Sequence, residues 1–549
     1  MYFTLAISAG SSQACAALVA AARGTDPRVM PIPGPARLAW QAADERTAVL
    51  RWGSAGSVAG AASHAGTIWI NPGPDVLSAR TGLARVDPVY LAETPGAVVV
   101  SDRASWAAAA TGRLGDFDPV MVGAFLSLGY PLGGATPFRG VRALGSDRMV
   151  RAAGGRLVLS QAQQESNAVP ASAALVGAAL VGAALVEAAL VEAVGPPGDA
   201  VELSLTGGKD SRLIAAALTA AGVPFRARTH GFASHPDVII AGMIAERLGL
   251  EHTVTEPRAA AAEKAPDQAE VLGRLRSAVL VSDGMLSAFE NVGQPDPQVT
   301  AGPVQAGGHG GELLRGGYAQ VAWRGSRASS SAAATEMFRR LTMRRLGLLR
   351  PAAAAAYLAS LGPYAAALAG GPLRALDDFY LVNRAGRWSA VARQAYLIRS
   401  PLLQPFFDDR VVRAARAVPL SERMNDRLHR AVLTELAPEL LGLPLAGSPW
   451  KGESRTAGNV IEAGPGSASA PDWRRAYGEK TAAFLREYVL DLGGTGPMFG
   501  IVRRQAAEHL LQPPQADRNA AWALATLAAL LSGDWLNARM PVSLSAASS

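Results

Sequence analysis

The residues of this sequence best suited to chemistry lie in the segment 201–216, VELSLTGGKDSRLIAA. An apolar run that predicts a strand leads into a glycine turn, and an Ala-, Leu- and Ile-rich stretch that predicts a helix follows at once. The turn consists of Thr206, Gly207, Gly208, Lys209, Asp210 and Ser211. Its glycines let backbone N–H groups approach an anion, and the helix N-terminus adds partial positive charge. The pattern therefore predicts a phosphate-binding turn.

This turn differs from two common nucleotide-binding motifs. It fits neither the pattern GxxxxGK[ST] nor the pattern GxGxxG, which argues against a P-loop NTPase and against a dinucleotide-binding fold. An ordinary strand-to-helix turn, capped by Asp210 or Ser211, remains the alternative interpretation.

The elements around the turn divide the chain into three segments. Residues 1–165 hold short apolar runs separated by Gly, Pro and Asp, which predict a mostly β domain with a helical insert near 120–127. Residues 166–200 hold an Ala/Leu/Val repeat helix and a linker. Residues 201–549 begin with alternating strand-like and helical stretches, typical of a parallel α/β sheet, and become largely helical beyond about 330. The predicted fold class is α/β, with an α+β N-terminal domain.

Composition excludes several classes of protein. The chain has 549 residues, is 49% hydrophobic and has one cysteine, Cys15, so a disordered chain, a disulfide framework and a multi-cysteine zinc site are excluded. The net charge is +7, and the arginines are spread along the chain rather than clustered, which argues against nucleic-acid binding. Only four of the 52 basic residues are lysines. A reducing cytoplasmic location fits this composition.

Two apolar segments were candidates for targeting or membrane insertion. The N-terminal segment lacks a basic region and is interrupted by polar residues, so it does not predict a signal peptide. The repeat at 173–194 is short, and Glu187 and Glu192 interrupt it. No membrane span is predicted.

Several segments resemble the asparagine-synthetase-like ATP pyrophosphatases, and the order of these segments along the chain supports the resemblance. SLTGGKDS resembles the SGGxDS pyrophosphate loop of that family, and GHGGELLRGGY at 308–318 resembles its GxGxDExxGGY motif. Further resemblances lie at 126–144, THGF at 229–232, Asp237, AERLGLEH at 245–252 and QPFFDDRVV at 404–412. The resemblance implies an ATP-dependent enzyme that adenylates a carboxylate, releases pyrophosphate and lets an amine displace AMP to form an amide.

The resemblance also implies a fold and a set of ligands. Residues 1–165 would form an Ntn-type glutaminase-like domain, and residues 201–549 an ATP-pyrophosphatase domain of the adenine nucleotide α-hydrolase type. ATP and Mg²⁺ are the implied cofactors, with Asp210 and Glu312 as metal ligands, although the family has an aspartate at the second position. The implied ATP and pyrophosphate contacts are Leu205, Thr206, Gly207, Gly208, Asp210, Ser211, Thr229, Gly231 and Gly308.

Two further residues receive catalytic roles from the resemblance. His309 lies where relatives carry the group that handles the proton of the attacking amine, and an imidazole with a pKa of ~6.5 can deprotonate an ammonium. Local hydrogen bonding within a glycine-rich loop is the alternative for His309, and a helix-start carboxylate is the alternative for Glu312. Lys451, in SPWKGES, resembles a lysine that stabilises charge on the acyl-adenylate and pyrophosphate.

The amine donor is predicted from the N-terminal segment. Relatives that use glutamine have a cysteine as the mature first residue, whereas residue 2 is Tyr and Cys15 lies in an apolar run. An inactive glutaminase domain is therefore predicted, with ammonia or an amine of the substrate as nucleophile.

Two groups of relatives share an inactive glutaminase domain. Chain length, Tyr2, the TGGKDSR loop and the helical C-terminal part look most like lasso-peptide macrolactam cyclases. Such an enzyme adenylates an Asp or Glu side chain of a leader-cleaved core peptide, whose N-terminal amine then closes an isopeptide ring. The implied partners are the precursor peptide, a leader peptidase and a leader-recognition protein. The alternatives are a β-lactam synthetase or other small-molecule amide ligase, and a catalytically silent scaffold subunit.

Overall fold

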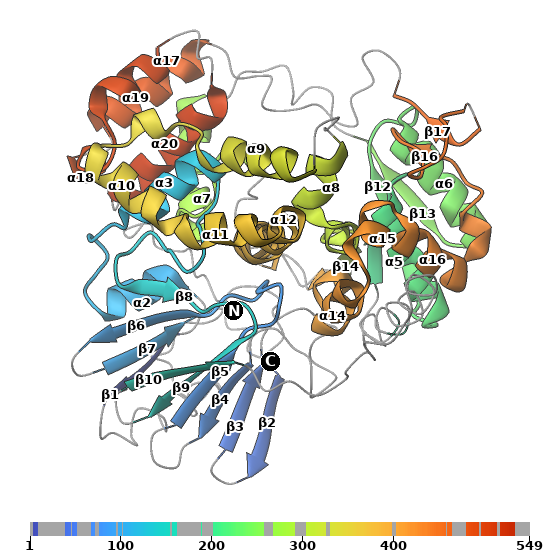
Figure 1. Cartoon of the computed structure of the whole chain (residues 1–549), viewed down its shortest axis with the longest axis horizontal. Coiled ribbons are helices and arrows are strands. Elements are labelled where there is room, and N and C mark those ends of the chain that lie inside the picture. The colour runs from blue at the N-terminus through green and yellow to red at the C-terminus, as the bar shows by residue number, and fades with distance from the viewer. Residues whose placement is uncertain are drawn as a thin grey trace, which may run out of the picture.

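The structure is a computed structural model of the whole chain (Figure 1). It describes residues 4–8, 39–44, 47–51, 67–71, 76–94, 97–101, 103–153, 156–161, 188, 191, 201–256, 267–290, 303–324, 330–397, 402–456, 458–463, 479–492, 496–512 and 517–532.

Two antiparallel sheets are formed by strands before residue 162, at the bottom of Figure 1. In order across the first sheet, the strands are β1 (Thr4–Ser8), β7 (Ala97–Ser101), β6 (Tyr90–Thr94) and β8 (Val141–Ala143). The second sheet contains β10 (Arg156–Gln161), β9 (Arg148–Ala153), β5 (Val76–Arg80), β4 (Thr67–Asn71), β3 (Thr47–Arg51) and β2 (Ala39–Asp44). The described part of this region is thus rich in β-strands, as the apolar runs predict.

Two helices accompany these sheets, α2 (Ala104–Ala110) and α3 (Pro119–Leu128). The position of α3 confirms the predicted helical insert. Asp118 caps it by accepting a hydrogen bond from the N–H of Val120, and Gly129 ends it in the left-handed conformation with φ 85°. The sequence analysis did not predict α2.

A five-stranded sheet, entirely parallel, forms the centre of the second half of the chain. Its strand order is β13 (His252–Thr255), β12 (Phe225–His230), β11 (Val201–Ser204), β14 (Val304–Gly307) and β15 (Leu402–Leu403). The helices α5 (Lys209–Ala220) and α6 (Pro236–Leu248) pack on it, α5 against β11 and β14, and α6 against β12 and β13. This parallel sheet with its helices confirms the α/β class.

The remaining described elements are mainly helical. The α-helices are α7 (Gln268–Ser282), α8 (Gly317–Arg324), α9 (Ser330–Thr342), α10 (Pro351–Ser360), α11 (Gly362–Gly370), α12 (Pro372–Phe379), α13 (Ala390–Leu397), α14 (Asp409–Ala417), α15 (Leu420–Met424), α16 (Arg427–Leu436), α17 (Glu479–Glu487), α18 (Gly496–Phe499), α19 (Arg504–Leu510) and α20 (Arg518–Ser532). Shorter 3-10 helices are Gly311–Arg315, Leu346–Leu348, Pro405–Phe407 and Pro438–Leu440, and π-helices are Tyr380–Ser389 and Tyr488–Leu492. A small parallel pair joins β16 (Leu445–Ala446) to β17 (Val460–Ile461).

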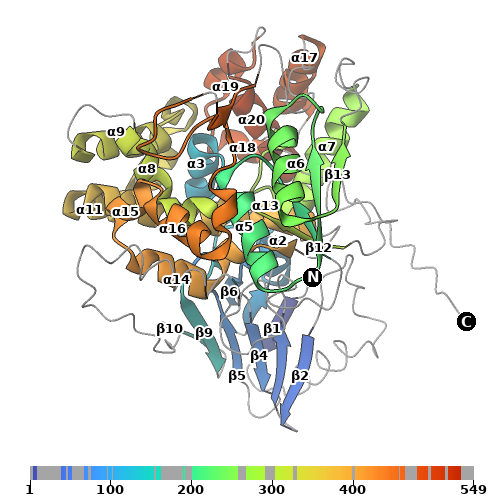
Figure 2. The ribbon, with the colours of Figure 1, turned by 90° about the vertical axis from the view of Figure 1, so that its right-hand side faces the viewer.

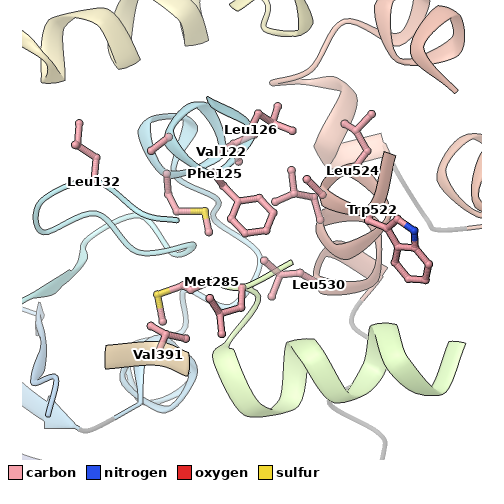
Figure 3. Packing of buried hydrophobic residues seen from close by; sticks show 14 of the residues in the cluster. Val122, Phe125, Leu126, Leu132, Met285, Val391, Trp522, Leu524 and Leu530 are labelled. Carbon is pink, nitrogen blue, oxygen red and sulfur yellow. The ribbon is translucent and has the colours of Figure 1, made fainter. Parts of the chain in front are cut away.

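One hydrophobic core joins the N-terminal helices to the C-terminal ones. In Figure 3, Phe125 of α3 points toward α20, whose Leu524 and Leu530 belong to the same buried cluster, as does Met285. Figure 2 shows α3 surrounded by helices from the second half of the chain. Segments far apart in the sequence therefore bury their apolar faces together, and this packing stabilises both.

Among the described residues, one helical segment has the length and composition to cross a membrane, residues 351–370. It is split into α10 and α11 at Leu361, which is buried. The ring of Tyr357 packs on Gly123 of α3, and its hydroxyl donates to the carbonyl oxygen of Thr342 over 2.9 Å. One side of the segment thus packs against α3 and its neighbours, while most of its other residues are exposed.

Several predictions lie outside the described residues. These are Tyr2, Cys15 and nearly all of the repeat segment 166–200, of which only positions 188 and 191 are described, as helical. The domain boundaries at 165 and 200 stay predictions.

Candidate active site

The strand order of the parallel sheet brings the two glycine-rich turns together. From β11 the chain continues outward to β12 and β13 on one side, while β14 and β15 lie on the other side. Ser204, the last residue of β11, pairs with Gly307, the last residue of β14. Ligands of parallel α/β sheets bind outside the carboxyl ends of strands where the order reverses in this way. A cavity of about 520 Å³ lies at this place.

The first turn is held in shape by Ser211. Its hydroxyl oxygen accepts a hydrogen bond from the N–H of Thr206 at 3.1 Å and lies 3.0 Å from the Thr206 hydroxyl. Gly208 precedes α5 in an extended conformation, and no side chain caps the helix. Thr206, Gly208, Asp210 and Ser211 all line the cavity, so the N-terminus of α5 borders it. An anion in the cavity would meet the positive end of the helix dipole.

Gly207, predicted to contact phosphate, is placed differently. Its N–H donates to Oδ1 of Asp237 at 2.9 Å, and Gly207 is not among the residues that line the cavity. A Cβ atom here would lie 2.9 Å from Ile240 and 3.0 Å from Ala446. Glycine at this position therefore allows α6 and β16 to pack closely against the turn.

The second turn packs directly on the first. A Cβ atom on Gly308 would lie 2.6 Å from the backbone nitrogen of Ser211, closer than real Cβ contacts allow, and one on Gly311 would overlap the side chain of Asp210. His309 and Glu312 come from this second turn, and both are exposed side chains at the cavity. The structure thus brings Asp210, His309 and Glu312 to one cavity from two separate strands.

Asp210 lies in a polar cluster under the turns. Its Oδ2 accepts a hydrogen bond from Nη2 of Arg315 at 2.5 Å, and its Oδ1 lies 3.3 Å from Nε2 of His429. Burial raises the pKa of Asp210, and the Arg315 guanidinium only partly offsets this. Burial lowers the pKa of His429 to about 3, with a further contribution from Arg315, so this imidazole is neutral.

The carboxylates fit a magnesium ion. Oδ1 of Asp210 is buried and accepts no hydrogen bond, and Glu312 is exposed at the same cavity. No group of three metal-ligating side chains gathers anywhere in the part of the chain that the structure describes. Mg²⁺ commonly takes one or two carboxylates and fills its other positions with phosphate oxygens and water. Asp210 and Glu312 could therefore hold Mg²⁺ together with a bound phosphate.

The two lysines proposed near the ATP site lie behind the first turn. Nζ of Lys209 forms a 2.6 Å ion pair with Asp426, a fully buried residue, and lies 4.9 Å from the ring centroid of Trp450. Burial alone would raise the pKa of Asp426, but Lys209 outweighs burial and lowers it. The backbone N–H of Lys451 also donates to Asp426, over 3.3 Å. Neither lysine is among the residues that line the cavity.

Three residues predicted to contact ATP, at the carboxyl ends of β11 and β12, do not line the cavity. The hydroxyl of Thr229 donates to the carbonyl oxygen of Leu205 at 2.8 Å and lies 2.8 Å from Nε2 of His252. The N–H of Gly231 donates to the carbonyl oxygen of Thr255 at 3.1 Å. None of Leu205, Thr229 and Gly231 lines the cavity. Their contacts shape the carboxyl ends of β11 and β12.

The sequence analysis missed several residues of the site. Arg315 lies three residues after Glu312 in the same glycine-rich segment, which is the one signal that could have found it. Tyr380, Arg384 and Trp388 come from the π-helix 380–389 and line the cavity. Burial and the negative charge of Glu312 raise the pKa of Tyr380 well above its usual range. Nothing in the sequence marks this segment as π-helical.

The two turns could bind phosphate, Asp210 and Glu312 could be ligands of a divalent cation, and His309 could act as a base at the cavity. Comparisons of the chain with protein-family models and with curated proteins find no match. The function proposed below rests on the residues and their arrangement.

Proposed function

We propose that the protein is an AMP-forming carbon–nitrogen ligase that makes an amide within a peptide. In this proposal it adenylates an Asp or Glu side chain of a leader-cleaved core peptide, and the N-terminal amine of that peptide closes an isopeptide ring. The observation that carries the proposal is the meeting of two glycine turns, with Asp210, His309 and Glu312, at the strand-order reversal of a parallel sheet. The motif resemblance at 204–211 and 308–318 supports the same chemistry.

The chemistry would proceed in two steps. A carboxylate oxygen of the substrate attacks the α-phosphorus of ATP, the bond to the β-phosphate breaks, and pyrophosphate leaves. The substrate amine then attacks the activated carbonyl carbon, AMP leaves, and the amine gives up a proton. Bound Mg²⁺ would neutralise charge on the pyrophosphate.

The residues of this chain divide these tasks. The N-terminus of α5 and the N–H groups around Gly208 would hold the pyrophosphate. His309 would accept the proton of the attacking amine, because it lies exposed at the cavity, three residues before the proposed metal ligand Glu312. The backbone N–H of Lys451 donates to Asp426, the partner of Lys209, and the Lys451 ammonium would stabilise charge on the acyl-adenylate and pyrophosphate.

We extend the proposal to the fold and the partners. The two antiparallel sheets would correspond to a glutaminase-type domain without a nucleophilic cysteine, so glutamine would not donate nitrogen. The parallel sheet would correspond to the ATP-pyrophosphatase domain. The precursor peptide, a leader peptidase and a leader-recognition protein would be its partners, in the cytoplasm. A small-molecule ligase such as a β-lactam synthetase would use the same residues.

A silent binding subunit is a second candidate. The 2.5 Å contact between Asp210 and Arg315 favours it, because the guanidinium already occupies one of the oxygens that a metal ion would take. Turnover decides between the two candidates.

The test is the nucleotide product. The purified chain, with Mg²⁺, ATP and candidate core peptides bearing Asp or Glu, should release AMP and pyrophosphate and yield a peptide lighter by one water. Release of ADP, or no turnover with any peptide or amino acid, would contradict the proposal.

Asp210→Ala should abolish pyrophosphate release. His309→Ala should slow ring closure more than pyrophosphate release, and equal loss of both steps would remove its role as base. Added glutamine should leave the rate unchanged.

A further inference from the structure

One π-helix, Tyr380–Ser389, contributes several side chains to the wall of the cavity. Tyr380, Arg384 and Trp388, spaced four residues apart, all line the cavity. The wider turn of a π-helix keeps such residues near one face, and π-helical segments occur frequently at functional sites. The position of Arg384 between two aromatic residues of this helix places a cation on the cavity wall.

Arg384 is fixed by aromatic contacts. Its guanidinium carbon lies 3.5 Å from the ring centroid of Trp388 and 5.9 Å from that of Tyr130. A guanidinium stacked on a ring through its flat face keeps its N–H edge available for hydrogen bonds. The side chain is half-buried, so its N–H groups can meet a ligand in the cavity.

Arg384 differs from the other cations around the cavity. Arg393, which also lines it, forms a buried ion pair with Asp87. Arg315 pairs with Asp210, and Lys209 pairs with Asp426. Within the described ranges, no carboxylate lies within ion-pair distance of Arg384. In the described part of the chain, Arg384 is therefore a positive charge at the cavity that no carboxylate neutralises.

The cavity wall also carries carboxylates. Glu290 and Glu312 line it, whereas the charge of Asp210 is offset by its ion pair with Arg315. A substrate that enters with a carboxylate therefore needs a cation on the wall to offset repulsion by Glu290 and Glu312. The planar fork of a guanidinium matches the two oxygens of a carboxylate.

We propose that Arg384, stacked on Trp388, is the subsite for a carboxylate of the acyl substrate. This inference rests on the proposed function, in which the bound carboxylate is the group that attacks ATP. Arg384 would hold it by charge-assisted hydrogen bonds at the cavity wall. The substrate class is then an organic acid or an acidic peptide side chain, and an amide of the same shape would be rejected.

The experiment uses two matched probes and the full-length protein. N-acetyl-glutamate α-methylamide carries the side-chain carboxylate, and N-acetyl-glutamine α-methylamide replaces it by an amide. Each is titrated by saturation-transfer NMR in the presence of Mg²⁺ and α,β-methylene-ATP. The wild-type protein should bind the glutamate probe with a Kd on the order of 1 mM. Its Kd for the glutamine probe should be higher by roughly tenfold or more. Arg384→Gln should weaken glutamate binding by roughly tenfold or more, and Arg384→Lys by less.

A matched control and a second ligand separate the outcomes. Arg504→Gln removes another arginine that stacks on a ring, 5.1 Å from the centroid of Phe499, and Arg504 does not line the cavity. This variant should leave the affinity for both probes unchanged. Equal glutamate binding by wild type and Arg384→Gln, or no glutamate binding by wild type, overturns the inference. So does a loss of α,β-methylene-ATP binding in Arg384→Gln with glutamate binding intact, because Arg384 would then hold phosphate. If wild type binds the glutamate probe but not the ATP analogue, the ligase proposal fails while the carboxylate subsite stands.

Discussion

At the scale of single residues, the pairing of Asp210 with Arg315 decides how the site is charged. Both side chains are largely buried, and their 2.5 Å contact places a fixed positive charge beside the proposed metal ligand. Burial alone would lower the pKa of Arg315, but the carboxylates of Asp210, Glu312 and Asp426 together raise it. Arg315 therefore stays charged and holds the Asp210 carboxylate in place. A bound metal ion would compete with Arg315 for this carboxylate.

Removing this guanidinium tests its role. Arg315→Gln should lower the free energy of unfolding by about 3 kcal/mol, because it leaves Asp210 buried without a counter-charge. The pKa of Asp210 would rise further above its unfolded value, so the loss should grow as the pH increases and shrink in acid. Urea unfolding at pH 5 and pH 8 measures both effects.

A less buried ion pair provides the control. Arg413 lies 2.9 Å from Asp147, with 37% of its side chain exposed. Arg413→Gln should change the free energy of unfolding by less than about 1 kcal/mol. If the two variants are equally stable, Arg315 does not support Asp210 in the way described.

At the scale of elements, the site depends on two strand-to-helix turns that touch. The first could be predicted, because a strand, a glycine turn and a helix start are local in sequence. The roles of Gly207 and Thr229 could not, because their partners Asp237 and His252 are brought close only by the order of strands in the sheet. The π-helix that carries Arg384 gave no sequence signal, since helix periodicity alone does not distinguish it from an α-helix.

The contact between the turns makes a specific prediction for Gly308. In Gly308→Ala the added Cβ would lie 2.6 Å from the nitrogen of Ser211, so the turns must separate. We expect the free energy of unfolding to fall by about 1–3 kcal/mol and the affinity for α,β-methylene-ATP to fall roughly tenfold. Calorimetry and urea unfolding measure the two quantities.

Gly347 offers the matched substitution. No atom lies within 4 Å of a Cβ built there, so Gly347→Ala should leave nucleotide affinity unchanged. Unchanged nucleotide affinity in Gly308→Ala would show that close packing of the turns is not needed for binding.

At the scale of the whole molecule, buried polar contacts join the N-terminal strands to the helical part. Asp283, at the end of α7, accepts hydrogen bonds from Nε of Arg103 at 3.0 Å and from the N–H of Ala104 at 2.8 Å, where α2 begins. Asp409 of α14 accepts one from the N–H of Leu83 at 2.7 Å. Asp283 and Asp409 thus hold the N-terminal segments against the helical part. Their partners could not be predicted from the sequence, because the contacts form only in the folded chain.

Asp409 gives this contact a pH dependence. Burial is the main cause that raises its pKa to about 6, against 3.8 for the ordinary group. Because the folded pKa lies above the unfolded value, the protonated form stabilises the fold at low pH, and this contribution is lost as the pH rises through about 6. Asp409→Asn keeps an oxygen for Leu83 and removes the titration.

The comparison at two pH values is the measurement. Relative to wild type, Asp409→Asn should be more stable at pH 8 than at pH 4.5 by about 2 kcal/mol, as read from urea unfolding. A difference between the two proteins that stays constant with pH would show that Asp409 does not titrate in this range.

The ion pair of Arg393 with Asp87 has a consequence for substrate discrimination. Arg393 lies in the cavity wall, whereas Asp87 belongs to the segment before β6. A residue of the N-terminal half thus sets the charge of a cavity whose phosphate turns lie elsewhere in the chain. Asp87→Asn would leave Arg393 at the cavity as a guanidinium without this carboxylate. The variant would attract anions of many kinds and lose the selectivity that the pairing of Arg393 maintains.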